Sequence, residues 1–326
     1  MAALTGTNLT FGGSGIAESF EDMIFDISPT DTPLLSMCKR LKANQTYHQW
    51  QIDNVASANS NRALEGDDPT FASLAPTTVL GNFCQISRKI GVISGTYDAV
   101  RKYGRKSELA YQLLKAGKEL KRDMEFSIVR NQDSTTGAGA GTARATGGIE
   151  AMIASSFDNG GNGLRATGTS TGSTAAFASN KWSAPTDGSA TAFTKADLDS
   201  ALGLAWADGG DPSTILTSAA NKTLLNSFSS VATRFVDVMK AEQASIVGGA
   251  SLYVSDFGVH KVVLNRYMRS QAVLGIDPEY VGVAYLRPIQ KVDIAKTGDA
   301  EKFMLLSEFA FVATNPNAHC KVFNLA

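Results

Sequence analysis

The sequence predicts an α+β fold from three observations. One stretch, residues 107–131, repeats apolar residues every three or four positions, as a long amphipathic helix does. Two stretches, 44–53 and 77–96, are rich in β-branched and aromatic residues and read as strands. After residue 194, helical and strand patterns alternate and the chain closes in strands. The 326 residues suffice for two compact domains, or for one body with large excursions, and a 43% hydrophobic content is that of a folded protein.

Composition excludes several classes of function. Thirty basic and 31 acidic residues give a net charge of −1, so no overall field favours tight binding to nucleic acid or a membrane. Cys38, Cys84 and Cys320 are odd in number and far apart, which predicts reduced thiols in a cytoplasm and no disulfide. We find no signal sequence and no apolar stretch long enough to span a bilayer, and we expect a soluble protein.

Residues 1–42 are interpreted as an N-terminal arm. The segment begins polar and glycine-rich, and Pro29 and Pro33 break any helix that starts near Ile16. Its apolar residues are too few to form a core by themselves, so they must lie on the chain's own body or on a neighbouring subunit. These residues are Phe20, Met23, Ile24, Leu34 and Leu35.

Residues 43–97 are interpreted as a long hairpin. Thr46, His48, Trp50 and Ile52 share one face of its first strand, and the second strand lies in 77–96. The polar connection between them carries an acidic tip formed by Glu65, Asp67 and Asp68. A mobile surface loop is the alternative, but long loops in compact domains are usually functional or disordered.

Residues 107–131 form the predicted long helix, with Ser107 as its N-cap and a length of roughly 37 Å at 1.5 Å per residue. The following segment, 133–192, is rich in Gly, Ser and Thr and reads as an extended insertion. Within it, the stretch around Ile149 and the isolated Phe177 and Trp182 are expected to dock on the body.

From residue 194 the chain regains globular character. Thr194 can cap a helix, a strand and a second helix follow, and two strands meet at a turn at Phe257 and Gly258. Three or four strands separated by Lys-Thr-Gly-Asp and Asn-Pro-Asn turns complete the chain.

The motifs for catalysis, phosphate and metals are weak. Gly168 to Gly172 has the spacing of a nucleophile elbow around Ser170, and Asp256 and His260 follow in hydrolase order, but the strand and helix that an elbow needs are missing from its flanks. The glycine-rich stretch after the long helix lacks a Gly-Lys-Ser/Thr motif. The histidines lie far apart, and His48 is expected to be a packed or interface residue instead of a ligand. We therefore expect no cofactor, no metal and no enzyme activity.

Several segments resemble tailed-bacteriophage major capsid proteins of the SU-ten-like family, which have the Hong Kong 97 fold. They are ISPTDTPLLSM, TYHQWQID, EGDDP, ISGTYDAV, GRKSELAYQLLKAGKELKRDME and EFAFVATNPNAHCKVFNL. The resemblance implies an N-arm (1–42), an E-loop (43–97), a peripheral domain with a spine helix (98–193), an axial domain (194–298) and return strands of the peripheral domain (299–326).

In this family the E-loop lies over an adjacent subunit, so the resemblance implies a charged contact through Glu65, Asp67 and Asp68. It further implies an arm that wraps a neighbour through Phe20, Ile24, Leu34 and Leu35, with His48 and Trp50 also at the interface.

The implied function is an icosahedral head shell of hexamers and pentamers that encloses double-stranded DNA without reading its sequence. Portal, scaffold and decoration proteins are the expected partners. Assembly is expected in the host cytoplasm, and the protein is expected in the virion. A cellular nanocompartment shell of the same fold and a cytosolic hydrolase using Ser170 remain the alternatives.

Overall fold

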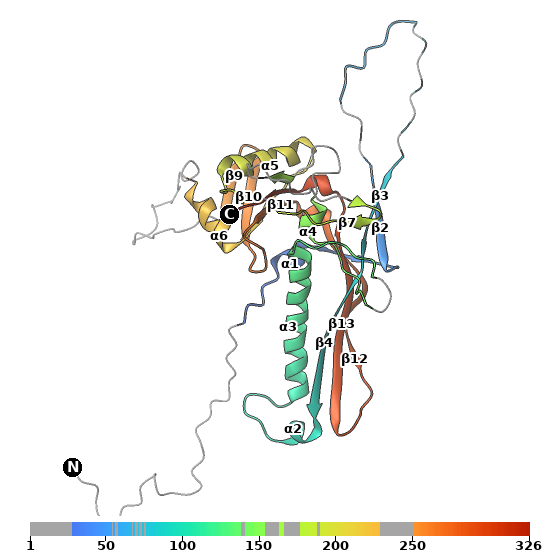
Figure 1. The fold of residues 1–326 in the computed structure, drawn as a ribbon, viewed down its shortest axis with the longest axis vertical. Coiled ribbons are helices and arrows are strands. Elements are labelled where there is room, and N and C mark those ends of the chain that lie inside the picture. Colours follow the sequence, from blue (N-terminus) through green and yellow to red (C-terminus); the bar gives the residue numbers. More distant parts are fainter. Residues whose placement is uncertain are drawn as a thin grey trace, which may run out of the picture.

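The computed structural model describes residues 28–53, 76–137, 141–153, 163–165, 177–187, 190–228 and 251–326, and in the first long loop residues 55, 58–66, 68, 71 and 74. Its body has two main parts, a long helix beside long strands and a second sheet covered by helices (Figure 1).

The first part is a four-stranded sheet with one long helix on a face. The sheet order is β1 (Lys39–Lys42), β12 (Val281–Asp293), β13 (Ala300–Ala313) and β4 (Gln85–Ser94). Helix α3 (Glu108–Val129) runs along the sheet, and Leu120 packs with Ile93 and Phe303. The helix agrees with the predicted span, and the Ala110 backbone N–H donates to the Ser107 hydroxyl over 3.4 Å, as expected of an N-cap.

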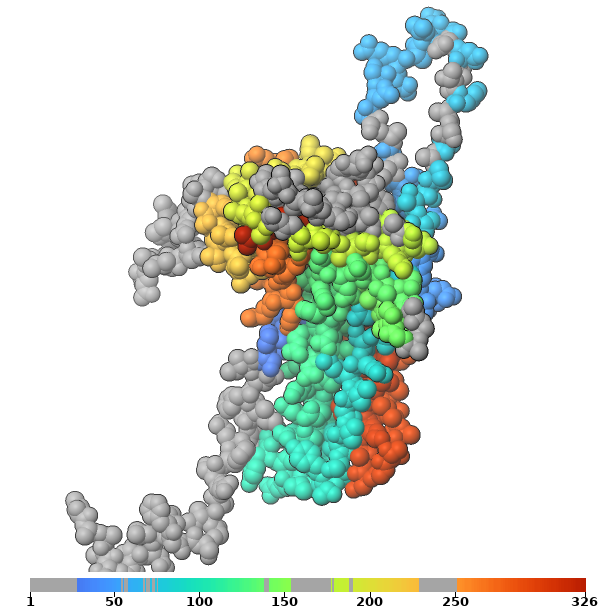
Figure 2. All heavy atoms as spheres, in the orientation of Figure 1, coloured from blue at the N-terminus to red at the C-terminus, as the bar shows by residue number. Residues whose placement is uncertain are grey.

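A hairpin stands at one end of this sheet. Strands β2 (Tyr47–Ile52) and β3 (Thr78–Phe83) pair antiparallel, with Trp50 opposite Leu80. The predicted strand 77–96 is in fact two strands, because β3 pairs in the hairpin and β4, which follows Cys84, pairs with β13. The described residues 58–66 of the connecting loop stand clear of the body (Figure 2).

The second part is a six-stranded sheet. Its order is β5 (Gly163–Arg165), β14 (Cys320–Phe323), β11 (Ala272–Ile276), β8 (Thr214–Thr217), β10 (Gly258–Leu264) and β9 (Leu252–Ser255). Helix α5 (Lys195–Ala207), capped by Thr194 and Asp197, packs Leu198 and Leu202 on one face. From the other face, Leu216 and Leu274 join the core that α3 and the first sheet share. Helix α6 (Ala219–Ser227) follows β8.

The remaining elements are short. They are α1 (Pro33–Met37), α2 (Gly95–Ala99), α4 (Ile149–Met152), β6 (Phe177–Ala178), β7 (Lys181–Trp182) and the 3₁₀ turns η3 (Pro278–Tyr280) and η4 (Pro316–Ala318). Ile149 and Trp182 are fully buried and Phe177 packs against the same core, so the predicted docking of these pieces is confirmed. The Trp182 indole donates to the Gly81 carbonyl over 2.9 Å, which fixes the insertion to the base of the hairpin.

The closing strands divide differently from the implied boundaries. β12 lies within 194–298, yet it belongs to the sheet beside α3. β14 lies within 299–326, yet it pairs with β11 and β5 in the six-stranded sheet. The chain thus crosses between the two parts more often than a simple order of domains implies, because long-range strand pairing is not encoded locally.

Candidate assembly surfaces

The residues of the possible hydrolase do not form a catalytic site in the described part of the chain. Ser170 lies outside the described residues. His260 is buried, with its Nδ1 2.7 Å from the Pro212 carbonyl and its Nε2 2.7 Å from the Ser255 hydroxyl. The Phe257 backbone N–H also donates to that hydroxyl, over 3.2 Å. The Nε2 contact therefore stabilises the β9–β10 turn, and the Nδ1 contact joins β10 to the segment before β8.

We find no metal cluster among the described residues, and no described helix is long and apolar enough to cross a membrane. His319 is fully buried, and the Asp277 backbone N–H donates to its Nδ1 over 3.1 Å. Burial lowers the pKa of this imidazole to about 4, which keeps it neutral. Cys84 and Cys320 are buried free thiols and Cys38 is a partly buried one, and burial raises the pKa of all three.

The long loop between β2 and β3 presents apolar and acidic side chains to solvent. Four large apolar residues in its described part, Val55, Leu64, Phe71 and Leu74, are 81% to 97% exposed. Glu65 and Asp68 are exposed beside them, while Asp67 lies outside the described residues. Exposed apolar side chains gathered on one extended segment are characteristic of an interaction surface.

His48 and Trp50 lie at the base of this loop and not on its tip. Their rings are 6.1 Å apart, and both residues are half-buried on β2. Trp50 packs against the main core of its own chain, and burial lowers the pKa of His48. The structure thus places them where they hold the hairpin on the body.

The arm residues predicted to contact a neighbour divide into two groups. Phe20 and Ile24 lie outside the described residues. Leu34 is fully buried in the core of its own chain and Leu35 packs against the same core. We therefore correct the role of Leu34, because a side chain with no exposed surface cannot contact a neighbour without leaving its core.

Glu125 on α3 holds this part of the arm. It is fully buried, and its two carboxylate oxygens accept hydrogen bonds from the backbone N–H groups of Leu34 over 2.9 Å and Leu35 over 2.7 Å. The side-chain amide of Asn265, which follows β10, donates to the same carboxylate over 2.6 Å. Burial raises the pKa of Glu125 although these three hydrogen bonds oppose the shift. One carboxylate therefore joins the arm, the long helix and the six-stranded sheet.

Two further buried carboxylates join segments that are distant in the sequence. Glu308 on β13 pairs with Arg144 from the insertion and with Arg287 on β12. Glu150 on α4 pairs with Arg269, which also contacts Asp187. Breaking a buried pair leaves an uncompensated charge, so these groups fix how the insertion sits on the body.

Comparison with known proteins assigns the chain to a family. The sequence profile of the SU10 major capsid protein family matches residues 3–326. The major capsid protein of Escherichia phage Phieco32 is 29% identical over 357 residues, covering 98% of this chain and 97% of that protein.

Solved structures of similar fold are also capsids. The capsid of a native GTA particle has a TM-score of 0.64 at 9% identity, and the capsid of cyanophage A-1(L) has 0.61 at 12% identity. Each likeness covers 97% of this chain and 98% of the other. The fold is thus the Hong Kong 97-like fold of tailed-phage capsids. The chain belongs to the SU10 major capsid protein family and is the major capsid protein of a tailed phage.

Proposed function

We propose that this chain forms the icosahedral head shell around the double-stranded DNA of a tailed phage, and that its β2–β3 loop lies over a neighbouring subunit. A major capsid protein associates with copies of itself into capsomers and is part of the virion. The observation that carries the proposed contact is the loop with Val55, Leu64, Phe71 and Leu74 exposed to solvent. Covering a large apolar side chain contributes about 1.5–3 kcal/mol, so a neighbour that covers this segment gains stability.

The acidic residues of the loop would select the register of that contact. Glu65, Asp67 and Asp68 would meet basic groups of the neighbour, where complementary charge adds more to specificity than to affinity. His48 and Trp50 would act from the base of the loop, by setting the angle at which it leaves the body. Leu35, Phe20 and Ile24 would contribute along the arm.

The two parts of the body would occupy different places in the shell. The sheet with α3, together with the residue range 98–193, would form the peripheral part, and the six-stranded sheet with α5 would gather around the fivefold and sixfold axes. Portal, scaffold and decoration proteins are the proposed further partners, and assembly would take place in the host cytoplasm. The role of the chain would be structural and not catalytic.

The test is electron microscopy of purified protein with a charge reversal in the loop. We expect the parent chain to form closed shells or tubes, and we expect Asp67→Lys with Asp68→Lys to lose them while its circular dichroism stays unchanged. The matched control is Asp67→Asn with Asp68→Asn, which removes the charges without reversing them and should assemble more weakly than the parent but better than the lysine variant. Normal assembly of the lysine variant would rule out the loop contact, and a parent that stays monomeric even with phage lysate would argue against shell formation.

A further inference from the structure

Strand β4 has a free edge. In the described part of the chain it pairs only with β13, in one continuous register. The Gly95 backbone N–H donates to the Asp299 carbonyl over 3.1 Å, and antiparallel pairing alternates from there, so Ile93, Gly91 and Lys89 direct their backbone groups to β13. The residues between them, Ile86, Arg88, Ile90 and Val92, therefore direct their N–H and C=O groups to the opposite edge.

The side chains of the same residues form an apolar stripe. Ile86, Ile90 and Val92 are 46% to 59% exposed and lie on the sheet face away from α3. Figure 2 shows β4 at the surface beside α3. Natural proteins protect long edge strands with proline, bulges or a covering segment, yet β4 has ten residues with no proline and no bulge. Arg88 and Lys89 place charge in the middle of the strand, but Ile90 and Val92 beyond them have no such protection, so a covering segment would complete it.

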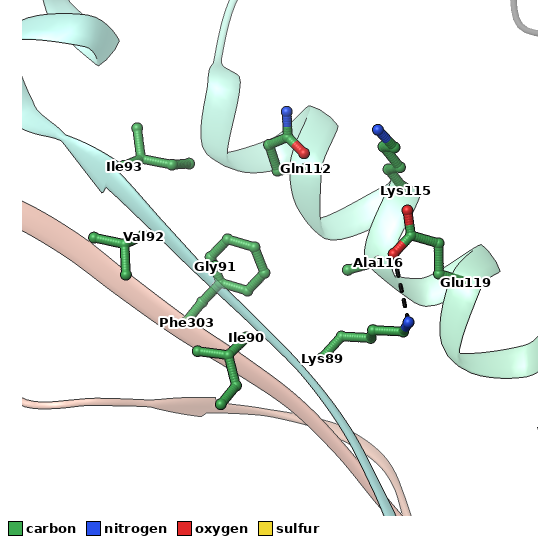
Figure 3. A pocket seen from close by; sticks show the side chains of 10 residues that line it. All are labelled: Lys89, Ile90, Gly91, Val92, Ile93, Gln112, Lys115, Ala116, Glu119 and Phe303. Atoms are coloured by element: carbon green, nitrogen blue, oxygen red, sulfur yellow. Dashed lines mark ion pairs between the residues drawn. The ribbon is translucent and has the colours of Figure 1, made fainter. Parts of the chain in front are cut away.

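A groove runs between this strand and α3. It has a volume of about 170 Å³ and is lined by β4 from Lys89 to Ile93, by Phe303 and by one side of α3. Gln112, Lys115 and Glu119 line the helix side of the groove, and Glu119 points to Lys89 on the strand (Figure 3). Lys89 pairs with Asp123 over 2.7 Å, whereas Lys115 is exposed and has no ion pair among the described residues. Lys89 also lies 3.8 Å from the Glu119 carboxylate, so the charges along the groove balance. The excess of positive charge lies at the start of the groove, where Lys115, Lys118 and Arg122 face Glu119 alone.

The arm approaches this groove as it is followed back towards the N-terminus. Leu34 and Leu35 lie at Glu125, and Ser28 to Thr30 lie at Lys115, Lys118, Glu119 and Arg122. The groove continues from there, since it shares Lys115 and Glu119 and adds Gln112 and Ala116. Successive residues of an α-helix are turned by about 100° around its axis. The α3 residues that line the groove therefore point, on average, about 60° away from the α3 residues beside Ser28 to Thr30, and the turn is towards β4. The residues immediately before Ser28 therefore begin beside the groove.

We infer that, in the unassembled subunit, residues 22–27 of the chain's own arm bind along the free edge of β4 as an added strand. The first 27 residues contain four acidic and no basic side chains, which complements Lys115 and the neighbouring Lys118 and Arg122. In an extended conformation, Met23, Phe25 and Ile27 share one face and would cover the apolar stripe of β4. Asp22 and Asp26 fall on the other face, towards α3. Backbone pairing would supply affinity, and the alternating side chains would supply register. This contact lies within one chain and does not depend on the shell proposed above.

Hydrogen exchange of unassembled protein tests this inference. We expect removal of residues 1–27 to accelerate exchange of the Ile86, Arg88, Ile90 and Val92 amides by on the order of tenfold or more, because free-edge amides lose their acceptors. The amides of Lys89, Gly91 and Ile93 face β13 and serve as the internal control, so a general loss of folding would change both sets. Equal exchange of the first set in the two proteins would overturn the inference.

Disulfide trapping tests the identity of the bound segment in the full-length chain. Three double variants each combine Ile90→Cys on β4 with one arm substitution: Met23→Cys, Phe25→Cys or Ile27→Cys. Testing three arm positions makes the result independent of the exact register in which the arm pairs with β4. The matched control pairs the same arm cysteines with Val259→Cys, an equally exposed position on β10. We expect dilute oxidation to give a compact, disulfide-linked monomer with Ile90→Cys alone, and Lys115→Glu to slow its formation severalfold. Linked dimers would show that another subunit's arm binds there, and either this result or the lack of any product contradicts the inference.

Discussion

Single residues in this protein carry information that the sequence pattern does not show. Glu125 lies on a helix whose Glu119 and Asp123 are partly exposed, yet it is buried and accepts three hydrogen bonds from uncharged donors. Its partners, Leu34, Leu35 and Asn265, are about 90 or 140 positions away in the chain. A helical period reports which face is apolar on average, so it could not identify one buried carboxylate among charged neighbours.

His319 makes the stability of the subunit depend on pH. Its folded pKa of about 4 is below the ordinary value of 6.5, because the fully buried ring has no room for a hydrated charge. A depressed pKa gives stability that is complete above the unfolded pKa and is lost as pH falls, here between about 6.5 and 4. At about 1.4 kcal/mol per pKa unit, this difference corresponds to at most roughly 3–4 kcal/mol.

Urea unfolding of the unassembled chain between pH 7 and pH 4.5 measures this effect. We expect His319→Asn, which keeps an acceptor for the Asp277 N–H, to show a flatter pH profile than the parent. Parallel profiles for the two proteins would assign the pH dependence to other groups.

Among the elements, the long helix was the most predictable and the strand pairing the least. Its cap at Ser107 and its apolar period are local, so the sequence predicted Glu108–Val129 within two residues at each end. The run 77–96 has uniform β propensity, and its division at Cys84 into β3 and β4 depends on partners from elsewhere in the chain.

Two glycines in different surroundings should respond oppositely to alanine. No atom lies within 4 Å of a methyl group added at Gly117, so Gly117→Ala should stabilise α3 by about 0.5–1 kcal/mol. A methyl group at Gly148 would lie 1.9 Å from the Arg130 carbonyl oxygen, so Gly148→Ala should destabilise the chain by about 1–3 kcal/mol or more. Thermal unfolding of the two variants and the parent gives the comparison, and a stabilised Gly148→Ala would contradict the packing described for α4.

For the whole molecule, the subunit is incomplete by itself. Its loop exposes Phe71 and Leu74, and the described residues of the same chain do not cover them. A protein that binds copies of itself gains stability by burying such a surface, whereas the β4 stripe of Ile86, Ile90 and Val92 is the proposed binding site of the chain's own arm.

Limited proteolysis should distinguish free from assembled subunits. Chymotrypsin should cleave after Phe71, and trypsin after Arg62, in the unassembled chain, since both residues are exposed in the loop. In assembled shells we expect cleavage at both sites to slow by on the order of tenfold or more, because the proposed loop contact would cover the segment. Equal rates in the two states would show that the loop stays uncovered.

The sequence by itself determined the α+β class, the long helix, the hairpin with its acidic loop, and the family, because periodicity, caps and short motifs are local properties. The tertiary structure alone decided that β12 joins the sheet beside α3, that β14 joins the six-stranded sheet, and that Leu34 belongs to the core and not to an interface. It also decided that Glu125 joins three segments and that β4 pairs with β13 alone among the residues that the structure describes. These features depend on contacts between residues far apart in the chain, and the free energy of such contacts is not contained in any local pattern.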